Sequence, residues 1–344
     1  MKIIFDIGHP KDFNIFKNAI TMLESRGHEI KIVGRAKENT KRIIREAAFD
    51  AEYGFHYKGI MGKIYGLLRN DIWLYSISKE FNPDLFVSLG TPYAAHASFL
   101  TRKHHISFTD TEIATFAIKL MLPFTHKVYT STSFELDFGN VHERFNGYLE
   151  LAYLHPKYFT PSYDVLDKYG LHGDYIIVRL SNLSAHHDIG AKGFAFSSED
   201  ELKQYIMALQ NYGRVIIFTE GSNYDWDIVK DNQLDIDTRD FHSILYYSKL
   251  YIGEGASMAS EAAVIGVPSI YVSNTERGYL NELEKTYGLV FNISDQNIAI
   301  RKSLELLSDD SIKLIWSKKR EIMLEDKVDV TAFIVETIEN FANK

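Results

Sequence analysis

The sequence predicts an α/β protein with two doubly wound, parallel sheets that follow one another along the chain. Short apolar runs of strand length alternate with longer segments whose apolar residues recur at helical spacing. The alternation stops around Pro156 and Pro161 and then starts again. A length of 344 residues suffices for two cores. We therefore expect domains at 1–155 and 156–325, and a helix at 326–344 that packs back across their junction.

The first half opens with a strand–turn–helix–strand unit. A strand is predicted at 2–7, a turn at 8–10, a helix that ends at Gly27, and a second strand at 29–33. Further helices are expected at 40–48, 63–79, 94–101 and 113–122, and further strands at 85–89, 105–108 and 127–130. The segment 151–161 has little periodicity and is expected to be a linker.

The second half repeats the alternation. Strands are expected at 175–180, 215–218 and 250–252 and from Ser269, and helices at 199–212, 241–248 and 309–344. In open parallel sheets, ligands bind beyond the carboxyl ends of the strands. The loops that follow the predicted strands are therefore the places to look for a functional site.

Composition limits the classes of function. The chain is 45% hydrophobic and 24% charged, as in ordinary globular proteins, and its net charge of −8 argues against a nucleic-acid partner. It has no cysteine, which excludes disulfides and thiolate catalysis. Its first residues lack the pattern of a signal peptide, and no apolar run is long enough to span a bilayer. We expect a cytoplasmic protein.

The segment 253–268 is the most informative. It begins with a Gly-x-Gly turn at Gly253 and Gly255 and continues as a helix of small residues that Gly266 and Pro268 close. Glycines permit unusual backbone angles and close approach of a ligand. The free N–H groups at the start of such a helix suit a diphosphate. Close packing of the helix on its sheet is the alternative explanation.

The first turn of this helix supplies the expected nucleotide contacts, from Ala256, Ser257 and Met258. Glu261 lies one turn further on, on the same face as Ser257. Its carboxylate could accept hydrogen bonds from the two hydroxyls of a ribose. The segment thus predicts half of a nucleotide-sugar site.

Two loops of the first half could carry acid–base chemistry. Gly8, His9 and Asp12 follow the first strand. Gly8 is expected among the residues that bind the nucleotide sugar, and His9 or Asp12 could take a proton from an acceptor hydroxyl. For Asp12 alone, a helix cap is the favoured explanation. Asp110 and Glu112 follow the strand at 105–108, where either could contact substrate or cap the next helix.

Three further residues are expected near the nucleotide sugar. His187 and Asp188 lie in a long polar loop after the strand at 175–180, where a solvated loop is equally compatible. Glu220 ends the strand at 215–218 and could contact the base or ribose, or form an ordinary turn. Adjacent histidines usually point apart, and the Asp-x-Asp pairs at 225–227 and 235–237 follow no clear strand end, so we predict no metal.

The sequence resembles a family of GT-B-like proteins, domain of unknown function 354, over nearly its whole length. The motifs that carry the resemblance are Phe5-Asp6-Ile7 with His9-Pro10, Arg26-Gly27-His28-Glu29, Phe108-Thr109-Asp110-Thr111-Glu112, Glu150-Leu151-Ala152-Tyr153-Leu154-His155-Pro156, His187-Asp188-Ile189-Gly190 and the segment 253–268. The family is distantly similar to UDP-N-acetylglucosamine 2-epimerases and to GT-B glycosyltransferases. This implies two Rossmann-like domains facing a cleft.

The resemblance implies that Gly255, Ala256 and Ser257 bind UDP and that Glu261 holds the ribose. A metal-independent glycosyltransferase of cell-surface glycan synthesis is expected, with a UDP-sugar as substrate, no separate cofactor, and a glycan or lipid-linked glycan as acceptor. The basic and apolar segment 58–69 allows peripheral contact with the inner face of the membrane, or a core-facing helix. A 2-epimerase remains an alternative. So does a non-catalytic binding protein, because Asp12, Asn14 and Leu183-Ser184 depart from the family pattern.

Overall fold

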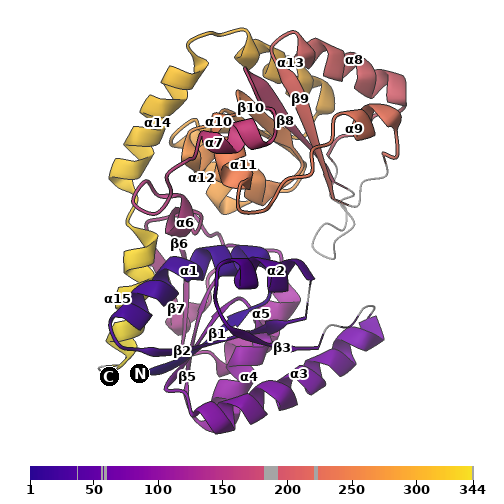
Figure 1. Cartoon of the computed structure of the whole chain (residues 1–344). Helices are drawn as coiled ribbons and strands as arrows, with labels where there is room; N and C mark the ends of the chain where they lie inside the picture. Colours follow the sequence, from indigo (N-terminus) through magenta and orange to yellow (C-terminus); the bar gives the residue numbers. More distant parts are fainter. Residues whose placement is uncertain (37, 56, 58–59, 182–192, 221–223, 343–344) are drawn as a thin grey trace. The chain divides into compact units, whose positions relative to one another are not determined.

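The computed structural model describes residues 1–36, 38–55, 57, 60–181, 193–220 and 224–342. They form two compact units, residues 1–153 with 328–344 and residues 154–327. Each unit contains one wholly parallel sheet with helices on both faces (Figure 1). The predicted architecture of two parallel α/β sheets is therefore confirmed.

Seven strands form the first sheet, in the order β3-β2-β1-β4-β5-β6-β7. Their bounds are β1 Lys2–Ile7, β2 Glu29–Arg35, β3 Ala51–Gly54, β4 Leu85–Leu89, β5 His104–Phe108, β6 Lys127–Ser131 and β7 His142–Phe145. Because all pairings are parallel, the carboxyl ends of the strands lie along one edge. This edge carries the candidate residues of the first unit.

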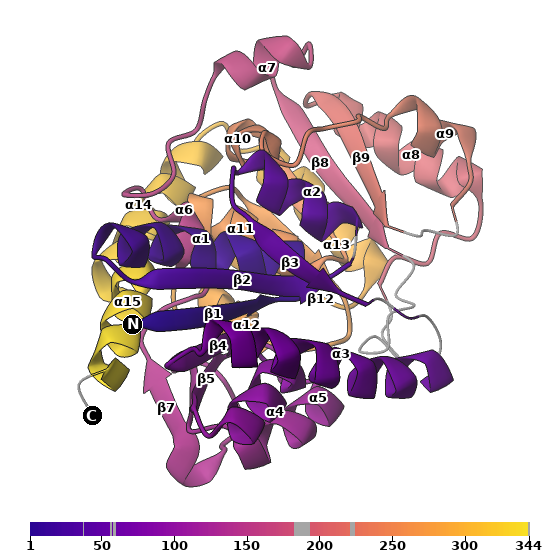
Figure 2. The ribbon, with the colours of Figure 1, turned by 60° about the horizontal axis from the view of Figure 1, so that its bottom comes forward.

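Helices cover the two faces of this sheet (Figure 2). On one face lie α1 (Pro10–Ser25), α2 (Glu38–Glu46) and α15 (Val330–Ala342); on the other lie α3 (Ile60–Phe81), α4 (Pro92–Thr101) and α5 (Thr115–Met121). Single turns of 3-10 helix occupy Leu122–Phe124 and Gly139–Val141, and α6 occupies Leu151–Leu154. No helix in the described chain, α3 included, is long and apolar enough to cross a membrane.

Five strands form the second sheet, in the order β12-β11-β10-β8-β9. Their bounds are β8 Tyr175–Ser181, β9 Arg214–Glu220, β10 Leu250–Gly253, β11 Ser269–Val272 and β12 Val290–Ile293. One face carries α10 (Phe241–Tyr247), α11 (Ala256–Ile265) and α12 (Gly278–Lys285), and the other carries α8 (Glu199–Gln210) and α13 (Gln296–Leu307). The remaining helices are α7 (Asp164–Lys168), α9 (Asp227–Asp231) and α14 (Ile312–Asp326).

The strands that the pattern did not predict are edge strands. β3 and β7 are the edges of the first sheet, and β12 is an edge of the second. An edge strand packs on fewer neighbours and tolerates polar residues, as in the sequence His-Glu-Arg-Phe of β7. Its apolar signal is therefore weaker than that of a central strand.

The expected linker at 151–161 is wrong at its start. Leu151 to Leu154 form the helical turn α6, and their side chains are almost wholly buried. The four apolar residues in a row are consistent with this burial. The linker was predicted from the prolines that follow them. The boundary between the units falls within this turn.

In the structure the expected helical tail contains two helices, α14 and α15. α14 belongs to the second unit, whereas α15 belongs to the first and packs against α1. The α15 side chains of Val330, Ile334, Val335 and Ile338 are fully buried. α15 thus completes the core of the first unit.

Replacing Ile334 with Ala should destabilise the first unit by roughly 2–5 kcal/mol, because it leaves a cavity beneath α15. The free energy of unfolding can be measured by urea denaturation. Glu336→Ala, at an exposed position of the same helix, should change it by less than about 0.5 kcal/mol. Equal effects of the two changes would show that α15 is not part of the core.

Candidate functional site

The Gly-x-Gly turn after β10 is shaped by an arginine on the neighbouring strand. A Cβ on Gly253 would lie 2.6 Å from the Cβ of Arg179 in β8, and a Cβ on Gly255 would lie 2.7 Å from Arg179 Nε. Neither glycine has a positive φ. The expectation that they adopt backbone angles other residues resist is therefore wrong. They are glycines because Arg179 occupies the space that side chains would need.

The N-terminus of α11 follows directly. Gly255 is its N-cap residue, and no side chain in the described chain caps it by a hydrogen bond. The first N–H groups, on Ala256, Ser257 and Met258, lie at a helix end that carries partial positive charge. The guanidinium of Arg179 lies beside this end, with Nη1 2.7 Å from the sulfur of Met258. The pattern of the strand did not lead us to Arg179, although a lone charge in the run Tyr-Ile-Ile-Val-Arg-Leu was visible.

Small residues also let α11 pack closely on its sheet. Ala259, Ala262 and Ala263 are fully buried, and Ser269 Oγ on β11 donates to the Ala259 carbonyl at 3.0 Å. Gly266 ends the helix in the left-handed conformation, with φ 86°. The packing explanation for this helix is thus confirmed, and it is compatible with a ligand at the other end.

Glu261 is buried, on the second turn of α11. Its Oε1 lies 3.2 Å from Nε2 of His242 on α10. Both side chains are close to nine-tenths buried. His242 was not among the predicted site residues, because nothing in the sequence relates it to α11. The pair fixes the orientation of the carboxylate that we expected to contact a ribose.

Glu254 lies between the two glycines and holds two backbone segments together. Its Oε2 accepts a hydrogen bond from the N–H of Ser181 at 2.6 Å, and its Oε1 from the N–H of Phe194 at 2.7 Å. Burial raises the pKa of Glu254 to about 7, although these hydrogen bonds and Arg179 oppose the rise. The carboxylate therefore points away from solvent and anchors the turn to β8.

Of the three other predicted residues of the second unit, only Glu220 belongs to the part of the chain that the structure describes. Glu220 ends β9, and its backbone pairs with Ser181. His187 and Asp188 lie outside the described residues. Among the described residues, no group of three His, Asp or Glu side chains is arranged to hold a metal ion.

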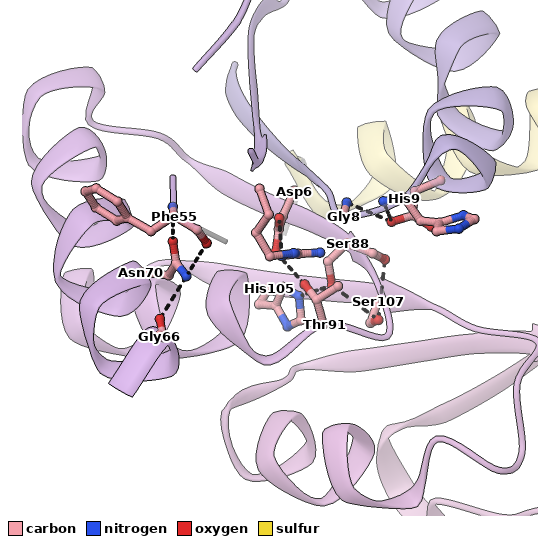
Figure 3. A network of polar contacts seen from close by, with 12 residues as sticks. Asp6, Gly8, His9, Phe55, Gly66, Asn70, Ser88, Thr91, His105 and Ser107 are labelled. Carbon is pink, nitrogen blue, oxygen red and sulfur yellow. Dashed lines mark hydrogen bonds and ion pairs between the residues drawn. The ribbon is translucent and has the colours of Figure 1, made fainter. Parts of the chain in front are cut away.

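In the first unit, His9 and Asp12 form a capping box at the start of α1 (Figure 3). His9 is the N-cap residue, and its Nδ1 accepts from the Lys11 N–H at 3.3 Å. Asp12 is the third helical residue, and its Oδ2 accepts from the N–H groups of Gly8 and His9 at 2.8 and 3.0 Å. The capping role predicted for Asp12 is confirmed.

Capping does not use the whole carboxyl group of Asp12. Both hydrogen bonds go to Oδ2, and the described residues offer Oδ1 no hydrogen bond. Burial raises the pKa of Asp12 to about 7, while Arg35 and the two N–H groups oppose the rise. A carboxyl group that is fixed in position and titrates near neutral pH is suited to proton transfer.

Arg35, at the end of β2, lies next to this loop. Its Nη1 is 3.2 Å from Asp6 Oδ1, its guanidinium lies 4.8 Å above the Tyr93 ring, and it fills the space beside Gly8. Thr91 donates a short hydrogen bond to the other oxygen of Asp6 (Figure 3). Arg35 was not among the predicted site residues, because the predicted strand ended at Val33, two residues before the end of β2.

Asp110 does not cap a helix. α5 begins at Thr115 with Ala114 as its N-cap and no side-chain cap, so neither Asp110 nor Glu112 has that role. Asp110 instead forms a short ion pair with Lys11, which also lies 3.1 Å from Glu150. Burial would raise the pKa of Asp110, but Lys11 and Thr111 hold it below its ordinary value. Asp110 is therefore ionised and bound by Lys11.

The candidate residues thus form two groups, one at the carboxyl edge of each sheet. The edge in the second unit offers N–H groups and a guanidinium, which suit an anionic ligand. The edge in the first unit offers Asp12 and the exposed His9, which can exchange protons.

Solved structures similar to this chain include members of two classes of enzyme. The chain is similar to a UDP-GlcNAc 2-epimerase from Neisseria meningitidis bound to UDP-GlcNAc (TM-score 0.70, 12% identity, 99% of this chain and 100% of that one). It is also similar to S. aureus MnaA with UDP (0.68, 11%, 99% and 97%). A third similar structure is the spinosyn forosaminyltransferase SpnP (0.65, 13%, 100% of both). At these identities the likeness shows the fold, and the fold is GT-B-like.

The chain belongs to the family described as protein of unknown function DUF354, whose model matches residues 1–343. This confirms the resemblance seen in the sequence motifs. No curated protein matches the sequence.

Asp12→Asn should change how stability depends on pH. The folded-state pKa of about 7 lies above the ordinary value of 3.8, so the stability that the protonated group contributes is complete below pH 4 and is lost as the pH rises through 7. Asn keeps the shape but does not titrate. Relative to wild type, the variant should therefore gain on the order of a few kcal/mol of unfolding free energy between pH 4 and 8.

Asp110→Asn is the matched control, measured by urea denaturation over the same pH range. The pKa of Asp110 is lowered, so its contribution is present above its ordinary pKa and is lost only as the pH falls below that value. Parallel pH curves for Asp12→Asn and wild type would contradict the assignment of a near-neutral pKa to Asp12.

Proposed function

We propose that the protein is a metal-independent GT-B-type glycosyltransferase. It transfers a sugar from a nucleoside diphosphate, UDP in our proposal, to a hydroxyl of a glycan or lipid-linked glycan in cell-surface glycan synthesis. The observation that carries the proposal is the uncapped N-terminus of α11 with the guanidinium of Arg179 beside it. Two of the similar structures contain UDP or UDP-GlcNAc, which supports the choice of nucleotide.

In this proposal the donor binds to the second unit. The diphosphate accepts hydrogen bonds from the first N–H groups of α11 and from Arg179, and Glu261 accepts from the ribose hydroxyls. When the bond between the sugar and the diphosphate breaks, negative charge develops on the leaving diphosphate. Fixed N–H groups and a guanidinium stabilise that charge without having to reorganise, so a metal ion is not needed.

Asp12 is the proposed base of the transfer. Its Oδ1 accepts the proton of the acceptor hydroxyl as that oxygen forms a bond to the sugar and the nucleoside diphosphate leaves. A pKa of about 7 lets the group be ionised in part of the molecules at neutral pH and still accept a proton. The exposed His9 is the alternative base. Asp110 is already paired with Lys11, so we assign it the positioning of α1 rather than proton transfer.

Arg179→Lys should weaken UDP binding at least about tenfold. Lys retains the charge but loses the planar fork that binds phosphate oxygens in pairs, and a hydrogen bond to a charged group contributes roughly 1.5–3 kcal/mol. Isothermal titration calorimetry with UDP measures the change. Both carboxylate oxygens of Glu254 accept hydrogen bonds from backbone N–H groups, so we expect the turn to stay folded in the variant.

Arg320→Lys is the matched control. Arg320 belongs to α14, and its side chain lies beside the C-terminal end of α11, opposite to the end near Arg179. Its Nε donates to the Val264 carbonyl at 3.0 Å, and its side chain packs beside Gly266. The UDP affinity of the Arg320→Lys variant should equal that of wild type. If both variants bind UDP as tightly as wild type does, Arg179 is not a diphosphate ligand.

A 2-epimerase is the second candidate, favoured by the likeness to UDP-GlcNAc 2-epimerases over the whole chain. Such an enzyme removes and returns the proton at C2 of the sugar and needs no acceptor. Incubation with UDP-GlcNAc in D2O distinguishes the two. As a transferase, the protein should leave C2 free of deuterium by NMR and release UDP only when an acceptor is added.

Deuterium at C2 without acceptor would replace the transferase proposal by the epimerase. Tight binding of the UDP-sugar without exchange, and without UDP release across a panel of acceptors, would instead identify a nucleotide-sugar-binding protein.

A further inference from the structure

A hollow of about 400 Å³ lies in the first unit, at the amino ends of β5 and β6. This is the edge of the sheet opposite to the one that carries Asp12. Its lining includes Phe99, Arg102, Lys103, His104, Phe124 and His126, and none of the lining residues that the structure describes has a carboxylate. The proposed function uses none of these residues.

No described residue supplies a counter-ion to the cations of the hollow. Neither Arg102 nor Lys103 makes a side-chain hydrogen bond or ion pair with any residue that the structure describes. The rings of His104 and His126 lie 4.5 Å apart. Both cations follow the last turn of α4, whose partial negative charge stabilises them in part. None of the described residues that line the hollow carries a full negative charge, so its chemistry suits an anion such as a phosphate.

Exposed apolar side chains adjoin the cations. Phe99 and Leu100, in the last turn of α4, are 62% and 55% exposed, and the Phe99 ring packs on Phe124 at 5.0 Å. The neighbouring helices α3 and α5, side by side with α4 on this face (Figure 2), expose further large apolar residues. These are Tyr65, Leu68, Ile72 and Phe116. Such a collection of apolar groups on one face indicates an interaction surface.

The charges on this face decide between two kinds of partner, a second copy of this chain and an anionic lipid surface. Arg69, Lys79 and Lys119 are exposed on α3 and α5, whereas Glu80 is the one exposed carboxylate among the described residues of α3, α4 and α5. A two-fold contact between copies of this face would place surplus cations opposite one another, which is unfavourable. An anionic lipid surface matches the same charges, and its acyl chains accept the apolar side chains.

We propose that this face, with the hollow at its end, binds membranes that contain anionic phospholipid. The phosphate of a lipid headgroup enters the hollow between Arg102 and Lys103, and Phe99 and Leu100 insert at the boundary between headgroups and acyl chains. The net charge of the whole chain is −8, so binding depends on this local cluster of cations. The site is independent of the proposed function, because it lies at the other edge of the sheet.

Sedimentation with vesicles tests this proposal. The wild-type protein is mixed at low salt with vesicles of phosphatidylcholine alone or of phosphatidylcholine with phosphatidylglycerol. Two double variants are compared with it. Arg102→Gln with Lys103→Gln removes the cations, and Phe99→Ser with Leu100→Ser removes the exposed apolar side chains. The matched control is Lys313→Gln with Leu314→Ser on α14, where a lysine and a 60%-exposed leucine are also adjacent. Thermal unfolding confirms that each variant is folded.

We expect wild type and the α14 control to sediment with the phosphatidylglycerol vesicles and not with phosphatidylcholine alone. The charge variant should bind about tenfold or more weakly, and the apolar variant should also lose binding. Added salt should release the wild-type protein.

The proposal is overturned if wild type fails to bind the anionic vesicles, binds both kinds of vesicle equally, or is unaffected by the α4 changes. Binding of inorganic phosphate without binding of vesicles would also overturn it. No nucleotide is present in the assay, so its outcome is separate from that of the proposed transferase.

Discussion

The packing of Arg179 against the turn between β10 and α11 is the constraint on which the candidate nucleotide site depends. Side chains at Gly253 and Gly255 would collide with it, so both positions lack one. A glycine at the N-cap has no side chain that could accept a hydrogen bond from the first N–H groups of α11. Glu254, between them, ties the turn to the N–H groups of Ser181 and Phe194. One guanidinium therefore determines the sequence of the turn and adds to its positive potential.

The carboxylates of the first unit show why one of them is assigned the chemistry. Asp6 is bound by Arg35 and Thr91, and Asp110 and Glu150 share Lys11. Each of these carboxylates already has a partner, and Lys11 holds the pKa of Asp110 below its ordinary value. Asp12 has two backbone N–H partners on one oxygen, and burial brings its pKa to about 7. The same capping box that begins α1 thus holds a titratable group at the edge of the sheet.

The sequence predicted the fold well because the central strands of both sheets are apolar runs between helical patterns. It missed β3, β7 and β12, which are edges and need less apolar surface. For the site, strand ends located Gly8, Asp12, Gly255 and Glu261. Partners from distant segments were invisible, since Lys11–Asp110 and Glu261–His242 are contacts that only the folded chain creates. The pairing of Asp110 with Lys11 shows that a position at a strand end does not establish a catalytic role.

A crystal structure of the protein with UDP tests the central claim most directly. The account predicts that the diphosphate lies within hydrogen-bonding distance of the N–H groups of Ala256, Ser257 and Met258 and of the guanidinium of Arg179. UDP bound elsewhere on the protein, or a helix end that stays free of nucleotide at saturating concentration, would contradict it.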